Sequence, residues 1–271
     1  QYLHDLYKEA SLPWEWHKPI FEFAKKEGLI CFSSPFDFTA VDFLEELNCP
    51  IYKIASFEIT DIPLIEYVAS KGKPIIISTG IAEIVDIELA IEACNKAGNN
   101  DITILKCTSA YPADPKDANL STIDDIKKRF KVNAGLSDHT LGIEAPMIAV
   151  AMGATVIEKH FILDKSIGGA DSHFSLDEQE FTKMVDAVRL TELIMGKPDY
   201  KISKSKNKSR EFSRSLFIVK DVKKGEIISN ENIRSIRPGF GLHPKELKNL
   251  IGRKFSTNQE KGTPLGWNMI Q

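Results

Sequence analysis

Short apolar runs that each end in polar residues recur along the chain between Leu29 and Phe161. Most of these runs are rich in β-branched residues and do not alternate with polar ones, which is typical of strands buried on both faces of a parallel sheet. The pattern predicts six such strands, in residues 29–34, 51–56, 74–80, 102–109, 132–140 and 154–161.

The segments between these runs have the spacing of amphipathic helices. Apolar residues three or four positions apart form stripes in residues 41–47, 84–94 and 181–188. Strand and helix therefore alternate, and repeated strand–helix units predict a parallel α/β fold.

Two architectures fit such repeats, a closed barrel and an open doubly wound sheet. Each predicted strand has polar or charged groups at its C-terminal end, and a barrel brings all such ends to one mouth. An open sheet concentrates its chemistry at one switch point, and no G-x-G-x-x-G follows a strand here. We therefore predict a (β/α)8 TIM barrel. Because six strands are counted, we expect the first two strand–helix units to be missing; a swapped or irregular barrel is the alternative.

The character of the chain changes after residue 197. Residues 198–211 are rich in Lys and Ser and predict a linker. Residues 212–271 contain short strand-like runs separated by Lys-Gly turns, which predict a small, mostly-β domain. The barrel domain is accordingly expected to occupy residues 1–197.

Composition narrows the class of partner and compartment. A formal net charge of −3 gives no electrostatic basis for binding nucleic acid. No apolar run approaches the roughly 18 residues that cross a bilayer, so no membrane partner is expected. The 4 cysteines have neither metal-type nor paired spacing, which indicates reduced thiols in a cytoplasmic protein.

Two histidines follow consecutive predicted strands, in the sequences SDHT and EKHF. In a barrel, His139 and His160 both lie at the mouth, about one strand spacing apart. Neutral imidazoles are ligands of divalent metal ions, and two of them leave positions open for substrate. The pair predicts a metal site; the alternative is that the imidazoles bond only to backbone groups.

A lysine lies inside the otherwise apolar run 51–56. Burying Lys53 is costly unless its ammonium meets an anion, so we predict a phosphate or carboxylate site there, or alternatively a structural ion pair with Glu58. Hydroxyl groups at the ends of the predicted strands are placed to complete this anion site. They belong to Ser34, Ser56, Ser78, Thr79, Ser109 and Ser137.

Other candidate residues are weaker predictions. Lys106 and Cys107 point to opposite sides of their strand, and a buried thiol is favoured over a nucleophile for Cys107. Asp171 follows a double-glycine loop and is placed to reach a sugar hydroxyl, unless the loop is plain surface. Arg237 precedes Pro238, which holds it extended to present its guanidinium to a polar ligand, unless it is an ordinary surface arginine.

The motifs YKIASFEI, ISTGIA, LKCTSAYP, GLSDHT, VIEKHF and RPGFGLHP occur in this order, and the chain resembles the sialic acid synthase family over almost its whole length. Its C-terminal part is similar to the SAF, or antifreeze-like, domain of that family. The segments LPWEWH, CFSSPFD and SIRPGFGLHP resemble the pseudaminic acid synthase branch most.

The resemblance implies an enzyme that condenses phosphoenolpyruvate with 2,4-diacetamido-2,4,6-trideoxy-L-altrose to a nonulosonic acid and phosphate, with Mn²⁺ or Mg²⁺. It implies His139 and His160 as metal ligands, and Glu58 and His139 as catalytic residues. It also implies a domain-swapped homodimer in which Arg237 reaches the partner's barrel. The substrate-binding residues it implies are Ser34, Lys53, Ser56, Ser78 and Ser137 for phosphoenolpyruvate, and Glu58, Tyr111 and Asp171 for the sugar. Ser109 is a further predicted substrate-binding residue, at a position where sialic acid synthases often have Asn.

One departure from the family is that its first-strand Glu and second-strand Lys motifs are absent, so we expect this chain to be poorly active or inactive. Three alternatives are kept. They are an N-acetylneuraminate or legionaminic acid synthase, a Schiff-base aldolase that uses Lys53 or Lys159, and a carbohydrate-binding or assembly module without activity.

Overall fold

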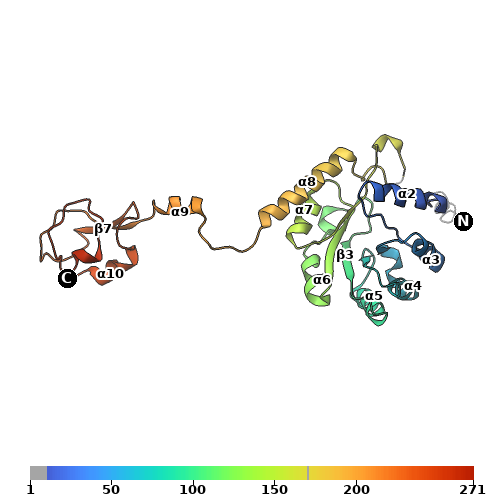
Figure 1. Ribbon diagram of the computed structural model, residues 1–271, viewed down its shortest axis with the longest axis horizontal. Helices are drawn as coiled ribbons and strands as arrows, with labels where there is room; N and C mark the ends of the chain where they lie inside the picture. The colour runs from blue at the N-terminus through green and yellow to red at the C-terminus, as the bar shows by residue number, and fades with distance from the viewer. Residues whose placement is uncertain (1–10, 170) are drawn as a thin grey trace. The chain divides into compact units, whose positions relative to one another are not determined.

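A computed structural model describes residues 11–169 and 171–271. The chain divides into two compact units, Gln1–Gly196 and Lys197–Gln271. Figure 1 shows helices fanned around a curled sheet in the first unit. In the described part of the chain, no helix is both long and apolar enough to cross a membrane.

The first unit alternates strands and helices, as the repeated pattern predicts. Its strands are β1 (Tyr52–Ile54), β2 (Ile75–Ser78), β3 (Ile102–Cys107), β4 (Asn133–Asp138) and β5 (Ile157–Lys159). Its α-helices are α2 (Trp14–Lys26), α3 (Phe38–Glu46), α4 (Ile62–Ala69), α5 (Ile84–Lys96), α6 (Thr122–Phe130), α7 (Glu144–Ala151) and α8 (Glu178–Met195). Short 3₁₀ turns are η1 (Ser56–Thr60), η2 (Pro115–Asp117) and η3 (Lys165–Ile167).

The five strands form one parallel sheet in the order β1-β2-β3-β4-β5. Isolated parallel bridges, Ser33 to Tyr52 and Phe161 to Leu176, extend it at its two edges. Every strand runs in the same direction, so all their C-terminal ends lie at one edge of the curled wall. The predicted parallel α/β architecture is confirmed as a half-barrel of five strands.

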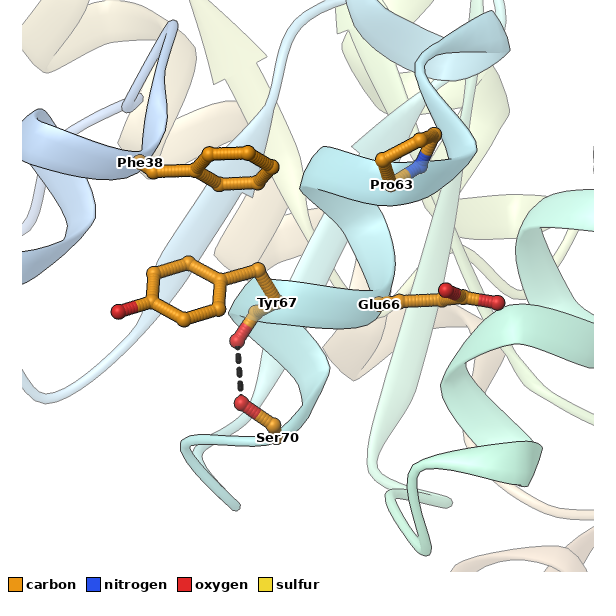
Figure 2. Close-up of a pocket in the computed structure, with 5 residues that line it drawn as sticks. All are labelled: Phe38, Pro63, Glu66, Tyr67 and Ser70. Carbon is orange, nitrogen blue, oxygen red and sulfur yellow. Dashed lines mark hydrogen bonds between the residues drawn. The ribbon is translucent and has the colours of Figure 1, made fainter.

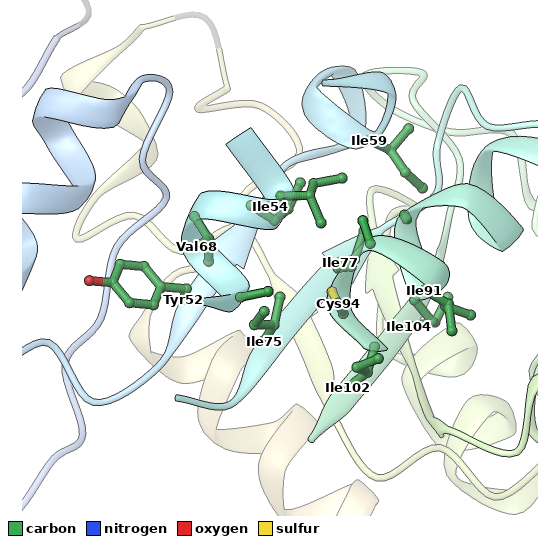
Figure 3. Packing of buried hydrophobic residues seen from close by; sticks show 14 of the residues in the cluster. Tyr52, Ile54, Ile59, Val68, Ile75, Ile77, Ile91, Cys94, Ile102 and Ile104 are labelled. Carbon is green, nitrogen blue, oxygen red and sulfur yellow. The ribbon is translucent and has the colours of Figure 1, made fainter. Parts of the chain in front are cut away.

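The packing of isoleucines between strands and helices holds this wall together (Figure 3). Ile54, Ile77 and Ile104 are fully buried on three consecutive strands and pack with Cys94 of α5 and Val68 of α4. Burying such side chains stabilises the fold by roughly 1.5–3 kcal/mol each. The predicted helical stripes in residues 41–47, 84–94 and 181–188 correspond to α3, α5 and α8.

The run at residues 29–34 departs from the prediction. It contributes a single bridge at Ser33 and no regular strand. Leu29 and Ile30 are 67% and 69% exposed, so this run is not buried on both faces. The reason is that it lies at the edge of the described sheet, with β1 on one side only.

The second unit has its own small core. An antiparallel pair, β6 (Ser215–Ile218) and β7 (Ile233–Ile236), packs Leu216 and Ile218 against Phe255. Its helices are α9 (Lys204–Arg210), which lies within residues 198–211, and α10 (Leu247–Leu250), and its 3₁₀ turns are η4 (Pro244–Glu246) and η5 (Trp267–Met269).

Truncating one core isoleucine tests this packing. Ile104→Ala is expected to lower the free energy of unfolding by about 2–5 kcal/mol, because it leaves a cavity between β3 and the helices. Ile84→Ala, at a position 49% exposed on α5, is the matched control and should change it by about 0.5 kcal/mol or less. Urea denaturation followed by circular dichroism measures both; equal losses would contradict the assignment of the core.

Candidate active site

A cavity of about 260 Å³ opens at the C-terminal ends of the strands. Two of its lining residues, Ala55 and Glu158, were not among the predicted site residues. The other eight were predicted and come from segments far apart in the sequence: Ser34, Lys53, Ser56, Ser78, Tyr111, Ser137, His139 and His160. The edge at which parallel strands end is where barrel enzymes carry their chemistry.

Lys53 supplies the positive charge of this cavity. Its side chain on β1 is 8% exposed, and its ammonium donates a hydrogen bond to the Ile54 carbonyl at 3.2 Å. Its nearest carboxylate is Glu158, with Nζ and Oε2 3.5 Å apart. Among the described residues, the ammonium of Lys53 forms its ion pair with Glu158 and not with Glu58, which the alternative had predicted.

Several hydroxyls in or next to the cavity have hydrogen-bonding capacity to spare. The buried Oγ atoms of Ser78 and Ser109 have no partner within the described structure. Ser56 accepts a hydrogen bond from the Gly80 amide at 3.0 Å and holds this turn against the cavity. A side chain at position 80 would collide with Ser109, so the close approach requires glycine. Buried hydroxyls without partners beside an ammonium favour an anionic ligand with several oxygens.

The two predicted histidines lie side by side, with ring centroids 5.1 Å apart. The Nδ1 of His139 lies 2.9 Å from the Thr108 carbonyl, which can only accept, so Nδ1 carries the proton and Nε2 is left as a lone-pair donor. The Nδ1 of His160 lies 3.4 Å from the Asp171 carboxylate. Both rings are oriented through one nitrogen, as second-shell partners orient metal-binding imidazoles.

These imidazoles fit part of a metal site. Within the described ranges, no group of three His, Cys, Asp or Glu side chains is arranged to hold a metal ion. Two imidazoles with oriented rings fit two positions of a divalent ion whose other ligands are water and substrate oxygens. Burial lowers the pKa of His160, which favours the neutral form that binds metal. Burial also lowers the pKa of His139, but contacts with Cys107 and the Thr108 carbonyl outweigh it and raise the pKa.

Glu58 lies on η1, directly after β1, and does not line the cavity. Burial raises the pKa of its carboxyl above the usual range, and nearby Lys53 opposes that rise in part. Its Oε2 is buried without a hydrogen-bond partner. A carboxyl with a raised pKa beside a polar cavity is suited to proton transfer.

The remaining predicted residues occupy three different positions. Ser109 is half-buried and touches the turn at Gly80, and Asp171 contacts His160 at the rim. Both adjoin the cavity without lining it. Arg237 is exposed in the second unit.

Glu158 is a site residue that the sequence did not predict, whereas Cys107 is a buried thiol, as predicted. Glu158 lines the cavity and accepts a 2.6 Å hydrogen bond from Ser137. The thiol of Cys107 lies 3.9 Å from His139 Nδ1 and 3.5 Å from the Ser56 hydroxyl. Burial raises the Cys107 pKa, but hydrogen bonds with His139 and its neighbours outweigh it and lower the pKa. The period of two along a strand was the available signal, since Glu158 shares the phase of His160.

A second hollow, of about 530 Å³, is lined by residues of the helical layer (Figure 2). It is lined by Phe38 of α3 and by Pro63, Glu66, Tyr67 and Ser70 on and just after α4. The Ser70 hydroxyl donates to the Tyr67 carbonyl at 2.6 Å. Glu66 is the single formal charge among these five residues, so the hollow lacks the groups that chemistry on an anion needs.

Family models divide the chain as the structure does. A model of the NeuB family matches residues 1–200 and a model of the SAF domain matches residues 213–271. The chain belongs to the NeuB family. The resemblance drawn from the motifs is thereby confirmed.

Individual relatives of this NeuB-family chain agree with that assignment. A pseudaminic acid synthase from Helicobacter pylori is 48% identical over 99% of this chain and 79% of the relative. One from Campylobacter jejuni is 49% identical over 97% of this chain and 77% of the relative. The crystal structure of the spore coat polysaccharide biosynthesis protein SpsE of Bacillus subtilis is 36% identical, with a TM-score of 0.66 over 96% of this chain and 78% of that one.

Lys159 of this NeuB-family chain is unlike Lys53, because it does not reach the cavity. Its side chain is 1% exposed, and its ammonium donates to Asp138 at 2.6 Å and to the Thr140 carbonyl. An amine held this way is unavailable as the nucleophile of a Schiff-base aldolase.

Chemical labelling tests the burial of Lys159. In the native chain, an amine-reactive acetylating reagent should modify Lys128, which is 74% exposed, and leave Lys159 unmodified until urea unfolds the chain. Peptide mass spectrometry over a time course measures both sites. Acetylation of native Lys159 at the rate of Lys128 would show that its ion pair is open.

Proposed function

We propose that this NeuB-family chain is a pseudaminic acid synthase, which joins phosphoenolpyruvate to the open-chain aldehyde of 2,4-diacetamido-2,4,6-trideoxy-L-altrose. The observation that carries the proposal is one cavity lined by an ammonium, several hydroxyls and two imidazoles. It is supported by relatives of that name at 48% and 49% identity.

The anionic substrate is assigned to the Lys53 side of the cavity. The ammonium neutralises part of the phosphate charge, and the hydroxyls of Ser56, Ser78 and Ser137 bind its oxygens, with Ser34 at the rim. Groups already in place stabilise charge in the transition state without reorganising. They therefore favour the step in which phosphate leaves after water adds at C2.

A divalent ion, Mn²⁺ or Mg²⁺, is assigned to His139 and His160. When bound, such an ion supplies Lewis-acid polarisation of the aldehyde that C3 of phosphoenolpyruvate attacks. The chain's own contribution is to hold both imidazoles with their Nδ1 atoms engaged, by Thr108 and Asp171. Their Nε2 atoms are thereby left for the ion.

The sugar is assigned to the rim, where the side chains of Ser109, Tyr111 and Asp171 lie close to the imidazole pair. The Tyr111 ring centroid is 4.4 Å from that of His139. Glu58, whose pKa burial raises, is the candidate for transferring a proton to or from the aldehyde oxygen.

Glu158 makes substrate binding an exchange of partners. Its carboxylate occupies the Lys53 ammonium and the Ser137 hydroxyl. Phosphoenolpyruvate is anionic and would be repelled at that position. Glu158 must therefore give up both contacts as the substrate binds.

The proposal extends to assembly and compartment. We assign Arg237, which is exposed in the SAF unit, to the barrel mouth of a second copy in a domain-swapped homodimer. We also propose a cytoplasmic location, because the spacing of the 4 cysteines is typical of reduced thiols.

Comparing the rate of phosphate release with three candidate sugars tests the proposed reaction. The chain is mixed with Mn²⁺, phosphoenolpyruvate and one of three sugars, the precursors of pseudaminic, legionaminic and N-acetylneuraminic acid. Phosphate release should be fastest with the altrose derivative, because the proposed pocket is built for it; the order of rates decides even when turnover is slow. A faster rate with another sugar would assign a different synthase. No release with any sugar, together with no binding of Mn²⁺ or phosphoenolpyruvate, would favour a module without this activity.

The role of Lys53 is tested by binding alone. Lys53→Met should weaken phosphoenolpyruvate binding about 10–100-fold, because a buried hydrogen bond to a charged group contributes about 1.5–3 kcal/mol. Lys220→Met, at an exposed position of the other unit, is the matched control and should bind as wild type does. Isothermal titration calorimetry measures both. Unchanged affinity in Lys53→Met would remove the anion site from Lys53.

A further inference from the structure

Behind the cavity wall lies a buried ion pair that the proposed reaction does not use. The Lys159 ammonium and the Asp138 carboxylate are 2.6 Å apart, with side chains 1% and 2% exposed. Neither residue lines the cavity. Burying two charges costs several kcal/mol each unless they are closely paired and hydrogen-bonded, so a pair so deep needs a reason for being there.

The strand register places this pair directly before the two histidines. Asp138 of β4 is paired with Lys159 of β5, and the preceding pair is Ser137 with Glu158. Successive side chains on a strand point to opposite faces. Ser137 and Glu158 face the cavity, the ion pair faces away from it, and the next residues, the two histidines, face the cavity again.

Thr140, the residue after His139, is hydrogen-bonded to both members of the ion pair. One oxygen of Asp138 accepts from the Thr140 amide at 2.9 Å and from its hydroxyl at 2.8 Å. The Lys159 ammonium donates to the Thr140 carbonyl. His139 therefore lies between two residues that are both bound to the end of the neighbouring strand.

The ion pair lies where β4 and β5 share few backbone pairs. β5 has 3 residues, and β4 and β5 are paired over 3 residue pairs, of which Asp138–Lys159 is the last. Apolar packing is non-directional, whereas a charge-assisted hydrogen bond fixes both distance and direction. The last pair before the histidines is thus the one that can set their spacing.

We propose that the Asp138–Lys159 pair is a positioning device, which holds His139 and His160 at the spacing that a divalent ion needs. This inference rests on the proposed function, because it takes the two imidazoles as the metal ligands. Asp138 and Lys159 act through the histidines and touch neither metal nor substrate.

Mn²⁺ binding by the whole chain tests this proposal without turnover. The variants are Asp138→Asn, which keeps the shape and the Thr140 contacts but removes the charge, Lys159→Met, and the two combined. Asp124→Asn is the matched control, since its ion pair with Lys128 is equally short but exposed on α6. Electron paramagnetic resonance measures free Mn²⁺, and circular dichroism measures folding and thermal unfolding.

The expected result is about 10–100-fold weaker Mn²⁺ binding in Asp138→Asn and Lys159→Met, as for other groups that orient metal ligands. The control should bind as wild type does. If a single variant fails to fold, the combined variant decides, because removing both charges leaves no unpaired buried charge. It should unfold at or above the temperature of the single variants and still bind Mn²⁺ at least about 10-fold more weakly.

Two results would overturn the inference in distinguishable ways. Folded variants that bind Mn²⁺ within about twofold of wild type would show that the pair contributes to stability alone. A wild-type chain that binds no Mn²⁺ would remove the metal site itself, and with it the proposed function.

Discussion

The site depends on one constraint, the burial of a lysine ammonium within an apolar strand. Lys53 is flanked on β1 by Tyr52 and Ile54, both fully buried, and its carboxylate partner is 3.5 Å away. A buried charge so loosely paired is costly unless an anion joins it. The buried hydroxyl of Ser78, which lines the same cavity and has no hydrogen-bond partner among the described residues, has the same need. Because all strands are parallel, the groups that an anion would satisfy meet at one edge, next to the imidazole pair.

Much of the fold follows from the pattern of apolar positions. Runs rich in isoleucine, such as residues 75–77 and 102–105, have few alternatives to a buried strand, and they form parts of β2 and β3. The run at residues 29–34 also begins with apolar residues, but it makes a single bridge. The composition of a segment shows whether it can form a buried strand. Whether the strand forms depends on the strands beside it in the sheet, and the sequence of one segment does not identify them.

The candidate site was predictable to the extent that it lies at strand ends. Position at strand ends predicts His139 and His160, since the C-terminal ends of parallel strands converge, and the cost of burying a charge inside an apolar run predicts Lys53. Glu158 is hard to predict because its role depends on contacts with residues of other strands. Ser137 is 21 residues away on β4, and Lys53 lies on β1. The Asp138–Lys159 pair was hidden for a similar reason, because its residues are separated by a whole strand–helix unit and only the register joins them.

The central claim is that the metal ion and phosphoenolpyruvate bind in the same cavity. A crystal structure of the chain with Mn²⁺ and phosphoenolpyruvate tests it most directly. The account predicts an anomalous peak for Mn²⁺ bound by His139 and His160. It also predicts the phosphate at Lys53, with Glu158 displaced from the ammonium. Phosphoenolpyruvate bound elsewhere, or Mn²⁺ bound by other residues while the two histidines contact only protein, would contradict it.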